Sequence, residues 1–157
     1  MTGELFLRHS VNKLRQMTGY VEDCVLKLDA DKVWQGPQNS VGNLVLHLCG
    51  NVRQWIGCSL GGEPDVRQRD REFAVESRVS TEELHFLLNG TMGEALSILE
   101  KFPPERLTER VSTQDGERFA LEVIYLVVGH FQQHAGQIIY ATKLLTGEDL
   151  KFYKKSS

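Results

Sequence analysis

The last long segment with helical periodicity, residues 120–146, carries two histidines beside the face that it must bury. Its apolar positions recur at helical spacing and include Val123, Val127, Ile138, Ala141 and Leu145. His130 and His134 stand next to this stripe on one helical face, so their Cβ atoms should lie about 5–6 Å apart. Two imidazoles at that separation can bind one metal ion. Phe131 occupies the position of the glutamate in the HExxH motif, so a zinc-protease mechanism is not expected.

Three earlier segments show similar periodicity, and together with the last one they predict an all-α fold, a four-helix bundle. The four helices are expected at residues 4–29, 40–60, 80–101 and 120–146. Ser40 suits the N-cap of the second helix, and Ser80 with Glu83 forms a capping box at the start of the third. The fourth helix has no good cap residue at its start, but Gly147 suits its C-terminal end.

The connections between these helices differ in length and character. Residues 34–39 form a short connection that contains glycine and proline, whereas residues 61–79 form a long polar stretch. Connections that long are usually functional or mobile, although a run of mixed charge often only faces water. Residues 107–119 contain Asp115-Gly116 between short apolar pieces, which predicts a small β-hairpin before the last helix. Such connections also allow a bundle topology other than simple up-and-down.

The composition is that of an ordinary globular domain. With 157 residues, we expect one domain over residues 1–150 and a polar C-terminal tail over residues 151–157. A net charge of −3 argues against a nucleic-acid partner, and no apolar run approaches the roughly 20 residues that cross a membrane. The N-terminus lacks the features of a signal peptide, and three cysteines without CxxC spacing favour a cytoplasmic location.

A third histidine, His47, borders the apolar face of the second helix. Burying a polar ring without a partner is costly. Binding a metal ion together with His130 and His134 would offset that cost, and so would a hydrogen bond to a carbonyl or carboxylate group. The two remaining histidines, His9 and His85, lie off the apolar stripes of their helices, so we expect ordinary surface roles for them.

The stretches around these histidines resemble the DinB/YfiT-like proteins. Residues 40–51, SVGNLVLHLCGN, are similar to the second helix of that family, and residues 130–138, HFQQHAGQI, resemble its HxxxH-x-x-Q-I signature. One histidine early in the chain and two late is also the order found in the family. Residues 69–73, RDREF, resemble a segment in the middle of an uncharacterised branch of the family.

The resemblance implies a four-helix bundle that binds nickel, zinc or a similar divalent ion through three histidines, often as a homodimer. Carried over residue by residue, the metal-binding role falls on His47, His130 and His134. Relatives with a known activity include bacillithiol transferases and mycothiol-dependent maleylpyruvate isomerase, which use the metal to activate a low-molecular-weight thiol. Others were proposed as metal-dependent hydrolases. No further motif in the sequence fixes the thiol, the small-molecule substrate or a catalytic residue.

Three neutral imidazoles would leave the ion's positive charge intact and at least one coordination position open, as at catalytic zinc sites. Such an ion can lower the pKa of bound water to about 7 and can deprotonate a bound thiol. Geometry should separate the metals, since a tetrahedral site suggests zinc and an octahedral one suggests nickel. Candidates for lining a substrate pocket, with ordinary packing as the alternative for each, are Asn43, Asn51, Trp55, Gln137, Arg69 and Arg71.

Three hypotheses about function follow from the sequence. The favoured one is a metal-dependent thiol-transferase or hydrolase with an open coordination position beside a pocket. The second is a non-catalytic metal-binding or stress-related bundle, in which the ion is closed off from solvent. The third is a helical bundle without a metal, whose histidines are paired by hydrogen bonds.

Overall fold

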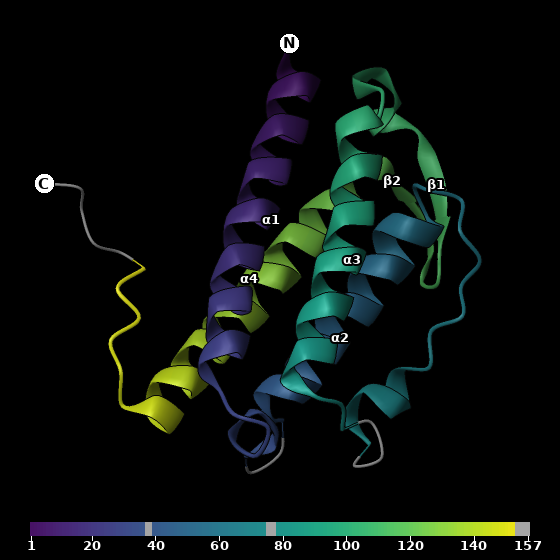
Figure 1. The fold of residues 1–157 in the computed structure, drawn as a ribbon. Helices are drawn as coiled ribbons and strands as arrows, with labels where there is room; N and C mark the ends of the chain where they lie inside the picture. The colour runs from purple at the N-terminus through teal and green to yellow at the C-terminus, as the bar shows by residue number, and fades with distance from the viewer. Residues whose placement is uncertain (37–38, 75–77, 153–157) are drawn as a thin grey trace, which may run out of the picture.

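The computed structural model describes residues 1–36, 39–74 and 78–152 and contains four long helices. They are α1 (Thr2–Lys27), α2 (Val41–Val52), α3 (Thr81–Lys101) and α4 (Ala120–Thr146). Helix α1 lies against both α3 and α4, and α2 packs between α3 and α4 on the far side of the bundle (Figure 1). The prediction of an all-α four-helix bundle is confirmed, with helices that are not arranged around the bundle in chain order.

Local capping interactions fix where these helices begin and end. At the start of α3, Ser80 Oγ accepts a hydrogen bond from the Glu83 N–H at 3.1 Å, and Glu83 Oε2 accepts one from the Ser80 N–H at 2.8 Å. Ser40 makes the same reciprocal pair with Asn43 at the start of α2. At the end of α4, Gly147 adopts a φ of 71°, a left-handed conformation that glycine adopts without strain.

The second helix does not continue in α-helical form to residue 60, as the sequence predicted. It changes after Val52 into a π-helix, η2 (Arg53–Cys58), with a wider turn. Trp55 and Ile56 are both buried in this segment, as the apolar stripe of the predicted helix requires. The first helix also ends slightly early, at Lys27.

Short helices occupy parts of the connections. The chain between α1 and α2 contains η1 (Lys32–Trp34), and the predicted long connection at residues 61–79 contains η3 (Arg69–Phe73). Residues 37–38 and 75–77 of these connections lie outside the described part of the chain. A further short helix, η5 (Pro104–Thr108), follows α3.

The short helix η1 packs directly on the start of α2 through a glycine. The indole ring of Trp34 lies where a side chain on Gly42 would be, with ring carbons 2.6–2.7 Å from the position of a Cβ atom. Trp34 Nε1 also donates a hydrogen bond to the Val79 carbonyl oxygen at 3.0 Å, which ties this connection to the start of α3. The tryptophan thereby fixes the end of α2 that precedes His47.

The predicted β-hairpin is present immediately before α4. Strands β1 (Arg110–Thr113) and β2 (Gly116–Phe119) pair antiparallel, and Gly116 turns the chain with a φ of 101°. The Phe119 N–H donates to Glu122 Oε2 at 2.8 Å. This hydrogen bond gives the backbone N–H at the start of α4 a partner, although the sequence showed no cap residue there.

The core is apolar and receives side chains from all four long helices. Its largest fully buried members include Leu14, Leu48, Leu88, Met92 and Phe131. No helix in the described ranges is long and apolar enough to cross a membrane. The predicted tail at 151–157 lies largely outside the described residues, but Phe152 stacks on Tyr20 of α1 with ring centroids 4.4 Å apart.

Candidate metal centre

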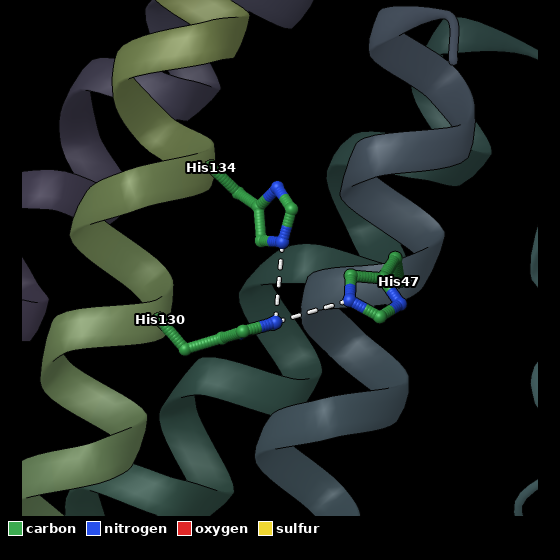
Figure 2. Close-up of side chains that lie close together, drawn as sticks. All are labelled: His47, His130 and His134. Atoms are coloured by element: carbon green, nitrogen blue, oxygen red, sulfur yellow. Dashed lines mark hydrogen bonds between the residues drawn. The ribbon is translucent and has the colours of Figure 1, made fainter. Parts of the chain in front are cut away.

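Three histidines from two helices meet between α2 and α4. His47 Nε2 lies 3.1 Å from His130 Nε2, which in turn lies 3.1 Å from His134 Nε2. Figure 2 shows His47 reaching from one helix toward His130 and His134, which lie one turn apart on the other. One ring nitrogen from each residue falls within 4.8 Å of the other two. The structure therefore brings together the residues predicted to bind a metal.

Hydrogen bonds at the opposite ring nitrogen orient two of these rings. The Nδ1–H of His47 donates to Glu72 Oε2 at 2.8 Å, and that of His134 donates to Gln137 Oε1 at 2.7 Å. A neutral imidazole that donates through Nδ1 carries a lone pair on Nε2. Both Nε2 lone pairs are therefore directed at the meeting point, as expected for metal-ligating histidines whose second nitrogen is held by another group.

The spacing of the ligand nitrogens fits a divalent ion. Nitrogens at about 2.0–2.1 Å from one ion lie roughly 3.0–3.4 Å apart. The two separations of 3.1 Å that involve His130 fall within this range. His47 is buried, and His130 and His134 are half-buried, so an ion held here would lie at the edge of the core rather than deep within it.

The environment keeps the rings of α4 neutral. Burial, followed by the charges that His134 and His47 would carry, lowers the pKa of His130 from 6.5 to about 4. Burial also lowers the pKa of His134, and His47 adds to this effect, although the hydrogen bond to Gln137 opposes it. Neutral imidazoles at pH 7 are the form that binds metal ions.

A carboxylate that sequence reasoning did not identify lies behind His47. Burial alone would raise the pKa of Glu72, but hydrogen bonds from Arg67 and His47 outweigh that effect and hold the pKa below its ordinary value. Arg67 Nε lies 2.7 Å from Glu72 Oε1, and Arg67 Nη2 lies 2.9 Å from Oε2. Such a bidentate pair is among the strongest charged hydrogen-bond arrangements in proteins.

Two of the predicted pocket residues lie inside the protein on the same helix as His47. Asn51 and Trp55 are each 8% exposed, and they follow His47 along α2 and η2 at intervals of about one turn. Among the described residues, Asn51 Oδ1 and Arg118 Nε are buried polar atoms without a hydrogen-bond partner. The guanidinium carbon of Arg118 lies 5.8 Å from the centre of the Trp55 ring. A ligand group could satisfy such atoms.

The other predicted pocket residues have different surroundings. Asn43 caps α2 and donates from Nδ2 to the Glu72 carbonyl oxygen at 2.9 Å, so it supports η3. Gln137 is exposed and accepts from His134. Arg69 and Arg71 are exposed on η3, and Arg69 lies over the ring of Phe73, 5.8 Å from its centre. The Phe73 ring is in turn 5.2 Å from the ring of His47.

A cavity of about 1080 Å³ lies on the other side of the Arg67–Glu72 pair. It is bounded by α2, η2, α3 and residues 63–72, and both members of the pair line it. The three histidines do not line this cavity, so it is separated from the point where their Nε2 atoms meet.

The chain's own thiols are poorly suited to act as nucleophiles. The three cysteines, Cys24, Cys49 and Cys58, form no disulfide. Burial raises the pKa of Cys24 to about 11 and that of Cys49 to about 12, and it also raises the pKa of Cys58. Because the thiolate is the reactive form, the buried Cys24 and Cys49 are expected to be inert at neutral pH, and the half-buried Cys58 is expected to react more slowly than a free thiol.

The fold and the site define the class of this protein: a DinB-like helical bundle with a three-histidine cluster between two helices. The chain belongs to the family described as "Protein of unknown function (DUF1572)", whose model matches residues 1–154. The prediction of a DinB-like family is confirmed. No curated protein matches the sequence.

A solved structure shares the fold. It is described as the crystal structure of the mycothiol-dependent maleylpyruvate isomerase, and it superposes with a TM-score of 0.66 at 16% sequence identity. The match covers 87% of this chain and 67% of the isomerase chain. At this level of identity the similarity establishes the fold alone.

Proposed function

We propose that this protein binds a divalent metal ion through His47, His130 and His134. We propose further that it is a thiol-transferase or hydrolase whose activity depends on that ion. The observation that carries the proposal is the convergence of three Nε2 atoms. His130 Nε2 lies 3.1 Å from His47 Nε2 and 3.1 Å from His134 Nε2. Hydrogen bonds from Nδ1 orient two of the rings, and the lowered pKa values of His130 and His134 favour their neutral form.

When bound, nickel or zinc would supply a Lewis acid that lowers the pKa of a water molecule or thiol. The three histidines would hold the ion without neutralising its charge. Asn51 follows His47 by one turn of α2, and its unpartnered Oδ1 would accept a hydrogen bond from a small-molecule substrate.

A low-molecular-weight thiol is the co-substrate that we favour. The structurally similar isomerase is described as mycothiol-dependent, which motivates the choice. Within this chain, burial holds the pKa values of Cys24 and Cys49 near 11 and 12, so the reacting sulfur would have to come from another molecule.

The alternative is a metal-binding or stress-related bundle without turnover. It is favoured by the position of the cavity of about 1080 Å³, which the three histidines do not line. On this alternative the ion would stabilise the packing of α2 against α4, and no substrate would need to approach it.

We further propose a cytoplasmic homodimer. The exposed side of α4 carries large apolar residues that a second copy would cover: Leu121, Tyr125, Leu126, Tyr140 and Leu144. The absence of a disulfide among three cysteines fits a reducing compartment. Sedimentation of the Tyr125→Glu variant against the wild type would test the dimer, since a charge on this face should shift the equilibrium to monomer.

The enzymatic proposal is tested by assaying metal-loaded protein against a panel of low-molecular-weight thiols, each with electrophilic acceptors, and against ester and amide substrates. We expect turnover that disappears in the His47→Ala variant. No turnover by fully loaded protein in either series would favour the non-catalytic alternative.

A further inference from the structure

We infer that Glu72, held by Arg67, positions His47 for metal binding. We infer also that Gly50, which has no side chain, leaves the space that the Glu72 carboxylate occupies. The inference rests on the proposed metal site. It assigns a role to the polar connection between α2 and α3, which sequence reasoning left as either functional or merely solvated.

The hydrogen bonds around Glu72 leave His47 one orientation. Both Arg67 Nη2 and His47 Nδ1 donate to the same oxygen, Glu72 Oε2, at 2.9 and 2.8 Å. Arg67 Nη2 also lies 3.2 Å from His47 Nδ1. A guanidinium nitrogen only donates and the Glu72 carboxylate only accepts, so a His47 Nδ1 that accepted from Arg67 would lose its hydrogen bond to Glu72. His47 Nδ1 must therefore carry the proton, and its Nε2 lone pair faces His130.

Arg67 and Glu72 are buried to the same degree as the histidine that they serve. The side chains of Arg67 and Glu72 are each 9% exposed, and that of His47 is 8% exposed. Arg67 Nη1 donates to Gln54 Oε1 at 2.8 Å, and Gln54 Nε2 donates to Asp65 Oδ2 at 2.7 Å. A chain of polar contacts thus anchors the carboxylate to η2 and to the start of the connection.

Gly50 is the position on α2 that Glu72 covers. A Cβ atom at residue 50 would collide with Glu72 Oε1 and would lie 3.0 Å from Arg67 Nε. Glycine in the middle of a helix costs about 1 kcal/mol relative to alanine. The close approach of the carboxylate accounts for a glycine here, one turn after His47, and a larger residue would displace Glu72 from the imidazole.

Two kinds of substitution separate this role from general stability. Gly50→Ala removes no polar group and raises helix propensity, yet it should displace Glu72. Glu72→Leu removes the acceptor, whereas Glu72→Gln keeps an oxygen that can accept from His47 Nδ1. Matched controls are Gly90→Ala, on α3 with open space around its Cβ position, and Glu100→Gln, whose carboxylate pairs with Arg15 away from the site.

The measurement is the affinity for Zn²⁺ and for Ni²⁺, by competition with a chromophoric chelator, alongside the thermal unfolding midpoint of each metal-free variant. We expect Gly50→Ala and Glu72→Leu to bind about 10- to 100-fold more weakly than the wild type, with Glu72→Gln in between. The histidine ¹⁵N spectrum should show the His47 Nδ1–H tautomer in the wild type and its loss in Glu72→Leu. Both control variants should bind as the wild type does.

Wild-type affinity in Gly50→Ala and Glu72→Leu would overturn the inference while leaving the metal site intact. If Gly50→Ala does not fold, Glu72→Leu and Glu72→Gln decide the question by the same criterion. Absence of metal binding by the wild type would overturn the proposed function, and this inference with it.

Discussion

His47 and His130 bring their Nε2 atoms to within 3.1 Å of each other, although 83 residues separate them in the chain. Burial and the neighbouring His134 and His47 lower the pKa of His130 to about 4, so the neutral form of His130 is favoured at neutral pH. The same contact therefore prepares the cluster for a cation and makes it sensitive to acid.

Acid should destabilise the metal-free protein through His130. Its pKa is about 4 in the folded chain, against the ordinary histidine value of 6.5 expected after unfolding, so between these values the unfolded chain binds more protons. The stabilising contribution is complete above pH 6.5 and is lost as the pH falls toward 4. We expect the free energy of unfolding, measured with urea after removal of metal by a chelator, to fall by on the order of 2 kcal/mol across this window.

The control for this pH dependence is a pair of histidine variants. His130→Asn should make the dependence between pH 6.5 and 4 shallower, with a remainder from His134, whereas His9→Asn, at an exposed position on α1, should leave it unchanged. An equally steep dependence in His130→Asn would show that other groups cause the acid sensitivity.

The cysteines should differ in reactivity according to their burial. Cys24 and Cys49 are buried, with pKa values raised to about 11 and 12, whereas Cys58 is half-buried. We expect a thiol-specific reagent at pH 7.5 to label Cys58 first and to reach the other two only after denaturation. Mass spectrometry of peptides from native and unfolded protein would measure this order. Rapid labelling of Cys49 in the native protein would contradict the packing of α2 against α3.

Gly42→Ala should destabilise the fold although alanine is the better helix former. The added Cβ atom would lie 2.6–2.7 Å from carbon atoms of the Trp34 ring, so η1 would have to move away from α2. We expect a loss of about 1–3 kcal/mol in the free energy of unfolding, the usual cost of overpacking. Gly19→Ala, in α1 with nothing within 4 Å of its Cβ position, is the control and should be neutral or stabilising. Equal stability of the two variants would contradict the Trp34 contact.

Local signals explain how far the sequence could predict this fold. Helix periodicity, the Ser80 capping box and the Asp115-Gly116 turn each act within a few residues, and the structure has the corresponding elements. The change from α2 to the π-helix η2 has no such signal, because the apolar stripe through Val52, Trp55 and Ile56 is equally compatible with a continuous α-helix.

The residues of the candidate site also divide into those that the sequence could predict and those that it could not. The three histidines could be selected because two are linked by helical spacing and the third lies on a buried face. Glu72 and Arg67 could not, since they stand in a charged stretch where Arg69 and Arg71 look equally suitable. Within η3 the structure buries Glu72 against α2 and leaves Arg69 and Arg71 exposed, while Arg67 reaches Glu72 from before the turn.

Metal content of the protein purified without a histidine tag tests the central claim most directly. We predict about one divalent ion per chain in the wild type, measured by elemental analysis, and its loss in His47→Ala, His130→Ala and His134→Ala. His9→Ala and His85→Ala should keep the ion. No divalent ion in a wild type supplied with zinc and nickel, or unchanged content in the three site variants, would contradict the account.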